Sequence, residues 1–134
     1  MNIDFATKAD IGYISERDKH IAKPRIPTKI QAKEIYILRE SDREIGWMRF
    51  GYFWDNTPFM NLLWIDEPYR GQGFGKKVVL HWEEQMKAQG YSAVMTSTQS
   101  NEEAQHFYRK LGYGDIGCLL QEKDPLEIIM SKKL

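Results

Sequence analysis

The sequence predicts one α/β (α+β) domain over residues 1–134, with a mixed, mostly antiparallel central sheet of about six to seven strands flanked by helices. Three observations support this fold class. Strand-like segments joined by short turns follow one another in the middle of the chain. Helical spacing of apolar residues begins soon after the last of them. The length of 134 residues fits one domain and leaves little room for two.

The N-terminal third combines a short strand with helices. Residues 3–5 are predicted to form a strand and residues 8–20 a helix. Pro24 and Pro27 interrupt the chain after that helix. A second short helix is predicted over residues 28–33, because proline is favoured at the start of a helix.

The middle of the chain predicts an antiparallel meander. Residues 34–39, 44–54 and 59–66 have strand-like composition, and short runs of turn-forming residues separate them. Strands connected by such short turns pair with their sequence neighbours in opposite directions. The meander therefore supplies three adjacent strands of the sheet.

The remaining chain alternates helices and strands. A helix is predicted over 73–89, a strand over 91–98, a helix over 104–111, and final strands over 113–120 and 126–131. A strand, a helix and another strand in succession predict a crossover connection between parallel strands. One parallel pair is therefore expected inside the otherwise antiparallel sheet.

Composition excludes several classes of protein. Lysines plus arginines equal aspartates plus glutamates, at 19 each, which argues against a general nucleic-acid binder. The first twenty residues contain no apolar signal region, and no run approaches the roughly 20 apolar residues of a membrane helix, so a cytoplasmic protein is expected. A single cysteine, Cys118, allows no internal disulfide and no cysteine-based zinc cluster, and it is expected to be buried. No metal is expected.

A glycine-rich turn at residues 70–75 joins a strand directly to a helix. Free amides at a helix N-terminus favour an anion, glycines let a phosphate approach, and Arg70 adds a positive charge. The segment is not a dinucleotide-binding fingerprint, because Lys76 stands where the third glycine would be, and it also departs from the P-loop pattern. A phosphate site is predicted, and the alternative is a helix start that merely needs a tight turn.

Two segments resemble the GCN5-related N-acetyltransferase (GNAT) superfamily. Residues 70–75, with the sequence RGQGFG, are similar to the R-x-x-G-x-G signature of that family. Residues 101–113, NEEAQHFYRKLGY, resemble its N-x-x-A-x-x-F-Y-x-x-x-G-F/Y segment, about thirty residues further on. The resemblance implies the GNAT fold, with the parallel pair at the cofactor cleft, and acetyl-CoA as co-substrate. It also implies that the co-substrate's phosphates are bound by Arg70, Gly71, Gln72, Gly73, Phe74, Gly75 and Lys76.

The resemblance also implies roles outside the glycine-rich turn. The backbone of the strand segment formed by Leu63, Trp64 and Ile65 should pair with the pantetheine arm, as an added strand would. Asn101 either contacts pantetheine or caps the helix that follows the S-x-x-E sequence at residues 100–103. Tyr108 is the predicted catalytic acid, which protonates the departing thiolate, and the alternative is a tyrosine that only packs on its helix. No residue is assigned as the general base.

The function implied is transfer of an acetyl group from acetyl-CoA to a primary amine on a small molecule, peptide or protein. The alternative is a coenzyme A-binding regulatory or sensor module with the same fold and no turnover. Neither a nucleic acid nor a membrane is expected as a partner, and a homodimer is left open. The sequence does not indicate which acceptor is used.

Overall fold

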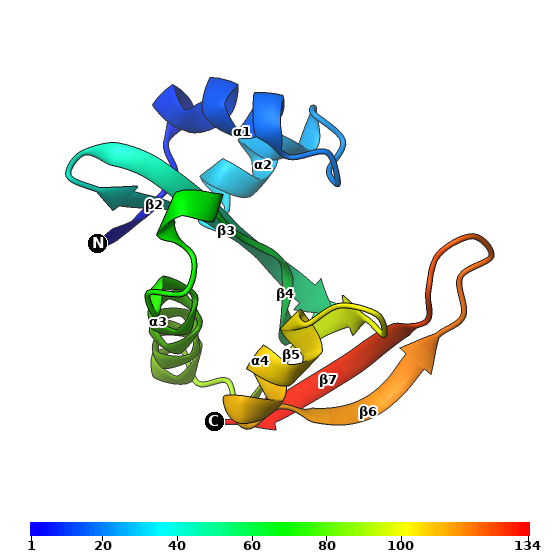
Figure 1. Cartoon of the computed structure of the whole chain (residues 1–134). Helices are drawn as coiled ribbons and strands as arrows, with labels where there is room; N and C mark the ends of the chain where they lie inside the picture. The colour runs from blue at the N-terminus through cyan, green and yellow to red at the C-terminus, as the bar shows by residue number, and fades with distance from the viewer. The chain divides into compact units, whose positions relative to one another are not determined.

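The computed structural model describes all 134 residues and contains seven strands and four α-helices. The strands are β1 (Asn2–Phe5), β2 (Ile35–Glu40), β3 (Arg43–Phe53), β4 (Thr57–Ile65), β5 (Ala93–Gln99), β6 (Gly114–Leu119) and β7 (Glu127–Lys133). The helices are α1 (Ile11–Arg17), α2 (Arg25–Gln31), α3 (Phe74–Ala88) and α4 (Ala104–Lys110), and single 3-10 turns lie at Lys8–Asp10 and Glu67–Tyr69 (Figure 1). The sheet order is β1-β2-β3-β4-β5-β7-β6, and β4 and β5 are parallel, which confirms the predicted fold class. None of the helices is long and apolar enough to cross a membrane.

The chain divides into two compact units. Unit 1 comprises Met1–Phe50 and Leu62–Val78, and unit 2 comprises Gly51–Asn61 and Val79–Leu134. Unit 1 therefore holds β1, β2, most of β3, the end of β4, helices α1 and α2, and the first turn of α3. Unit 2 holds the start of β4, strands β5 to β7, the rest of α3, and α4.

In unit 1, the two N-terminal helices share one hydrophobic core with the first strands. Ile26 and Ile30 lie one turn apart on α2, so both face the same side, and they are buried together with Ile14 of α1. The other members of this core are Ala6, Ile35, Ile37 and Trp47. Figure 1 shows α1 and α2 next to each other beside β2 and β3.

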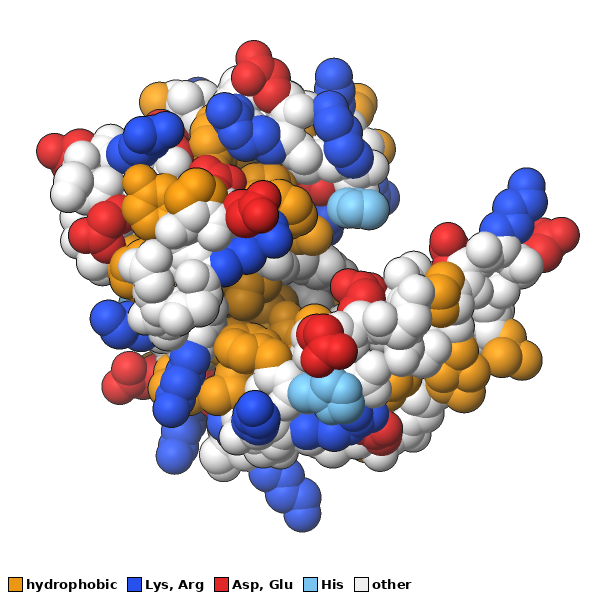
Figure 2. Space-filling model, viewed as in Figure 1, with side chains coloured by type: hydrophobic (Ala, Val, Ile, Leu, Met, Phe, Trp, Pro, Cys, Tyr) orange, Lys and Arg blue, Asp and Glu red, His pale blue; other side chains and the backbone are white.

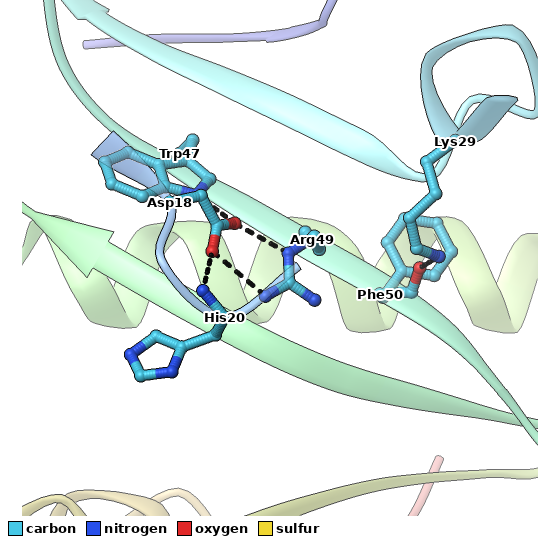
Figure 3. A network of polar contacts seen from close by, with 6 residues as sticks. All are labelled: Asp18, His20, Lys29, Trp47, Arg49 and Phe50. Atoms are coloured by element: carbon cyan, nitrogen blue, oxygen red, sulfur yellow. Dashed lines mark hydrogen bonds and ion pairs between the residues drawn. The ribbon is translucent and has the colours of Figure 1, made fainter. Parts of the chain in front are cut away.

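The helix expected over residues 8–20 ends at Arg17, because a polar network holds the next residue in extended conformation (Figure 3). The Asp18 carboxylate accepts hydrogen bonds from Arg49 Nε at 2.7 Å, from Trp47 Nε1 at 3.1 Å and from the His20 amide at 3.0 Å. Burial alone raises the pKa of Asp18, but these hydrogen bonds and the Arg49 charge outweigh it and hold that pKa below its ordinary value. The hydrogen bonds of Asp18 to Trp47 and Arg49 therefore hold the α1–α2 connection against β3.

The second helix begins earlier than expected. α2 begins at Arg25, three positions before the predicted start at Thr28. Pro27 lies in its first turn, where the missing amide hydrogen costs no helical hydrogen bond. Toward the other end of the helix, Lys29 Nζ donates to the carbonyl oxygen of Phe50 of β3 (Figure 3).

In unit 2, α3 and α4 cover the same face of the sheet. Glu83 of α3 accepts hydrogen bonds from Lys132 Nζ of β7 at 2.7 Å and from the Tyr113 hydroxyl at 2.8 Å. Tyr108 of α4 reaches Met60, which pairs with Thr96 of β5. Val94 pairs with Lys132, and Thr96 lies two residues after Val94, so Thr96 and Lys132 point to one face of the sheet.

Two sequence-based expectations in unit 2 are wrong. Cys118 is exposed, because β6 is an edge strand whose six residues are all exposed on both faces. The S-x-x-E sequence forms no capping box, since α4 begins at Ala104 without a side-chain cap. Glu102 Oε1 instead accepts a hydrogen bond from the backbone amide of Gln99 at 3.2 Å, inside the turn that precedes the helix.

Gly46 of β3 allows the end of β4 to approach closely. A Cβ atom at this position would lie 2.0 Å from the carbonyl oxygen of Trp64. We expect Gly46→Ala to lower the free energy of unfolding by more than about 2 kcal/mol, because backbone atoms must move to relieve the clash. Gly12 of α1 has no atom within 4 Å of such a Cβ, so Gly12→Ala should instead stabilise the protein by roughly 0.5–1 kcal/mol. Urea unfolding of the two variants tests this, and equal stability of Gly46→Ala and wild type would contradict it.

Candidate functional site

The glycine-rich turn presents a row of unpaired backbone amides at the start of α3. Gly71 and Gly73 have φ angles of +73° and +83°, in the left-handed region that glycine adopts without strain. The amides of residues 71–73 donate to no backbone carbonyl, and the first amides of α3 have no acceptor within the helix. A Cβ at Gly71 or Gly73 would meet no atom of the chain within 4 Å. This segment therefore offers hydrogen-bond donors and open space to an anion.

Arg70 has a structural contact that the sequence did not predict. Its Nε donates to the carbonyl oxygen of Ile65 at 2.7 Å, and its guanidinium lies 4.6 Å from the ring centroid of Trp64. Gln72 Nε2 donates to the carbonyl oxygen of Pro68 at 3.1 Å, within the same turn. Arg70 thus holds the turn against the end of β4, Gln72 braces the turn internally, and the arginine charge stays exposed beside the free amides.

The end of β4 has an unpaired edge. Only two residue pairs join β4 to β5, Phe59 with Met95 and Met60 with Thr96. On the other edge, the amide of Asp66 donates to Ile45 of β3, so the Ile65 carbonyl in the same trans peptide points away from β3.

The three residues predicted to pair with pantetheine differ in what their carbonyls contact. The Trp64 carbonyl lies against Gly46 of β3, and the Ile65 carbonyl faces the open edge but accepts from Arg70. Leu63 belongs to the same part of β4, beyond its last pair with β5. The pairing of Leu63, Trp64 and Ile65 with a ligand stays a prediction.

Tyr108 lies where the pairing of β4 and β5 ends. Its side chain is 8% exposed, and its hydroxyl lies 3.9 Å from Met60 Sδ. Met60 belongs to the last β4–β5 pair, and Thr96 Oγ1 donates to its carbonyl oxygen at 3.1 Å. Burial raises the pKa of Tyr108 to about 12, and the Glu102 charge adds to that effect. The phenol is therefore protonated throughout the neutral range and available as a proton donor.

The second motif contributes one further predicted residue, Asn101. Its side chain is exposed in the turn before α4 and makes no hydrogen bond, so the capping alternative is wrong. Contact with a ligand stays a prediction. Residues 63–65 and 70–76 belong to unit 1, whereas Asn101 and Tyr108 belong to unit 2.

Glu127 of β7 is a candidate site residue that the sequence did not reveal. It is partly buried, and Ser97 Oγ of β5 donates to its Oε2 at 2.6 Å. No lysine, arginine or histidine forms an ion pair with it, unlike the buried Glu83, which binds Lys132. The residue lies outside both sequence motifs, and only the placement of β7 next to β5 brings it close to Ser97.

The charges are distributed without a dominant sign on the face of the molecule that is drawn in Figure 2. Basic and acidic side chains both occur across that face, in line with equal totals of 19 each. The positive charge of Arg70 beside the free amides is therefore local, with no extended basic surface on the face that is drawn.

Comparison with known proteins identifies the family. Residues 8–113 match the family model described as the acetyltransferase (GNAT) family, and this range includes the glycine-rich turn, Asn101 and Tyr108. No curated protein matches the chain in sequence.

Solved structures match nearly the whole chain. Ard1 from Thermoplasma volcanium is 15% identical with a TM-score of 0.84, over 99% of this chain and 97% of that one. The PaiA N-acetyltransferase from Thermoplasma acidophilum, in complex with coenzyme A, is 18% identical with a TM-score of 0.79, over 99% and 98%.

A further structure shares more sequence over a smaller part of the chain. A protein assigned as a streptothricin acetyltransferase from Bacillus anthracis str. Ames, in complex with acetyl coenzyme A, is 25% identical with a TM-score of 0.67, over 75% of this chain and 61% of that one. The family model covers well over half of the sequence, and both motifs of the resemblance lie inside it. The chain therefore belongs to the acetyltransferase (GNAT) family.

Proposed function

We propose that this N-acetyltransferase, whose acetyl donor is acetyl-CoA, binds the pyrophosphate of that co-substrate through the amides of Gly71 to Lys76. The observation that carries the proposal is the row of unpaired amides at the N-terminus of α3, a helix of 15 residues. Such a terminus attracts anions through its donors and its dipole. Arg70 contributes positive charge and, through its bond to Ile65, keeps the turn in place.

We further propose that the pantetheine arm pairs with the backbone of Leu63, Trp64 and Ile65 at the open edge of β4, as an added strand would. β4 runs through Leu63 and Ile65 without interruption, and its last pair with β5 is at Met60. From the sequence motif we also propose that Asn101 contacts pantetheine.

Tyr108 is the proposed acid for the leaving sulfur. Its hydroxyl lies beside Met60, at the end of the β4–β5 pairing. When an amine attacks the thioester carbon, the C–S bond breaks and the sulfur leaves as a thiolate. The Tyr108 hydroxyl donates its proton to that sulfur as the charge develops, and solvent returns a proton to the tyrosine.

The acceptor is proposed to be a primary amine on a small molecule, a peptide or a protein. One GNAT domain over residues 1–134 and a cytoplasmic location are predictions from the sequence, and a homodimer is left open. The absence of a metal requirement is another such prediction.

Turnover on an amine and peptide panel tests the proposed function. We expect coenzyme A to be released from acetyl-CoA in the presence of an acceptor, with a matching acetylated product in the mass spectrum. Reactions without acceptor and reactions with heat-denatured protein are the controls. Binding of acetyl-CoA without any acetylated product, across amines and peptides, would instead support a coenzyme A-binding regulatory module.

A further inference from the structure

Glu127 and Tyr108 lie on opposite faces of the sheet in unit 2. Tyr108 belongs to the face that α3 and α4 cover, where Thr96 and Lys132 also point. Ser97 follows Thr96 along β5, so its side chain points to the other face. Glu127 bonds to Ser97 and therefore shares that second face, which neither helix of unit 2 covers.

The Glu127 carboxylate lies close to the end of the β4–β5 pairing. Thr96 is the last residue of β5 that pairs with β4, and Ser97 is the first residue beyond it. The Glu127 backbone pairs with Gln99, but its carboxylate reaches back to Ser97 at 2.6 Å. A strand rises about 3.3 Å per residue, so the carboxylate lies within about two residues of the last pair.

The surroundings of Glu127 leave it available to a cationic ligand. Its only side-chain hydrogen bond is the one from Ser97, and no cation lies within ion-pair distance. Its strand partners, Gln99 of β5 and Leu119 of β6, are uncharged. Glu102, an acid close to Gln99, accepts a hydrogen bond from the Gln99 amide. Glu127 is thus the one partly buried carboxylate of unit 2 that has no cationic partner and faces away from the helices.

We infer that Glu127 is the proton acceptor for the acetyl acceptor's ammonium group, an inference that rests on the proposed function. An alkylammonium ion near pKa 10 must lose a proton before it can attack. Glu127 takes that proton, the nitrogen lone pair forms the N–C bond, and the C–S bond breaks as Tyr108 protonates the sulfur. The second nitrogen proton passes to solvent, so the products are the amide, coenzyme A with its thiol and one released proton.

The placement of the two groups suits this chemistry. An amine that approaches from the helix-free face meets Glu127 first, while the leaving sulfur is protonated from the helix-covered face. Separate faces also keep the proton donor and the proton acceptor from exchanging a proton directly. The acceptor class that follows is a protonated primary amine, since a neutral hydroxyl would give the carboxylate no charge to bind.

The test uses the best acceptor from the panel and three variants of the full chain. Glu127→Gln keeps an oxygen that accepts from Ser97 but cannot take up a proton, so the fold should survive, and thermal unfolding checks that. We expect kcat/KM at neutral pH to fall about a hundred- to ten-thousand-fold. Glu127→Asp should retain part of the activity. Glu122→Gln is the matched control, because Glu122 is exposed and forms no ion pair, and its kinetics should equal those of wild type.

The pH profile separates a proton acceptor from a structural carboxylate. The wild-type profile should be nearly flat between about pH 6 and pH 8, because the enzyme takes up the ammonium form, which is almost all of the amine over that range. The Glu127→Gln rate should rise about tenfold per pH unit over that range, because only the free amine reacts. Unchanged kcat/KM in Glu127→Gln, or a loss with the wild-type pH profile, overturns the inference and leaves the proposed function standing. No turnover in wild type overturns both.

Discussion

Tyr108→Phe is expected to lower kcat by about a hundred- to ten-thousand-fold while leaving acetyl-CoA affinity nearly unchanged. The substitution removes only the hydroxyl, whose contact to Met60 Sδ at 3.9 Å is a weak one. The ring should keep its edge-on packing against Phe107 and Tyr113. The loss would therefore be confined to the transition state, where the phenol donates to the developing thiolate. Steady-state kinetics and a separate binding titration measure the two quantities.

Tyr113→Phe is the matched control. Its hydroxyl donates to the buried Glu83 at 2.8 Å, so the variant should lose about 1–3 kcal/mol of stability. We expect its kcat to stay at the wild-type level below the unfolding temperature. The pKa of Tyr108, raised to about 12, also means that the phenol stays protonated up to that range, so its own ionisation should cause no loss of rate below about pH 11. An unchanged kcat in Tyr108→Phe would show that the residue only packs.

Periodicity and turn chemistry were enough to predict the elements of the fold. The meander was predictable because short turns join neighbouring strands, and α3 because its apolar residues repeat at helical spacing. The glycine-rich turn was also predictable, because its free amides and positive φ angles depend on one short segment of sequence.

Features that depend on distant partners could not be predicted. α1 stops at Arg17 because Asp18 bonds to Trp47 and Arg49, which lie 29 and 31 residues away in the sequence. The exposure of Cys118 follows from the position of β6 at the edge of the sheet, and an apolar stretch does not distinguish an edge strand from a central one.

The place of Glu127 could not be predicted either, because it also depends on a partner that is distant in the sequence. The C-terminal strands were predicted from composition, but their order in the sheet was not. The order β5-β7-β6 places β7 between its sequence neighbour and β5, and only then does the carboxylate meet Ser97. No sequence pattern around the glycine-rich turn could reveal a residue that lies on β7.

Gly73→Val is expected to abolish measurable binding of acetyl-CoA while the fold is retained. A Cβ at residue 73 meets no atom of the chain, so nothing in the protein itself resists the larger side chain. At a φ of +83°, however, valine is strained, and relief of that strain would turn the neighbouring amides away from the ligand. The loss of two charge-assisted hydrogen bonds, at about 1.5–3 kcal/mol each, weakens binding by at least roughly a hundredfold.

Gly90→Val provides the matched control for backbone strain. Gly90 follows the other end of α3, has a φ of +98°, and would likewise have open space around an added Cβ atom. The two variants should therefore lose similar amounts of stability in thermal unfolding. Gly90 is far along the chain from the free amides at the start of α3, so its substitution should leave acetyl-CoA binding intact.

Calorimetric titration of acetyl-CoA into wild type, Gly73→Val and Gly90→Val tests most directly whether the glycine-rich turn holds the co-substrate. Wild type and Gly90→Val should show saturable binding with one site and similar affinity, and Gly73→Val should show no measurable heat of binding. Equal affinity of Gly73→Val and wild type would place the pyrophosphate elsewhere, and no binding to wild type would contradict the assignment of acetyl-CoA to this turn.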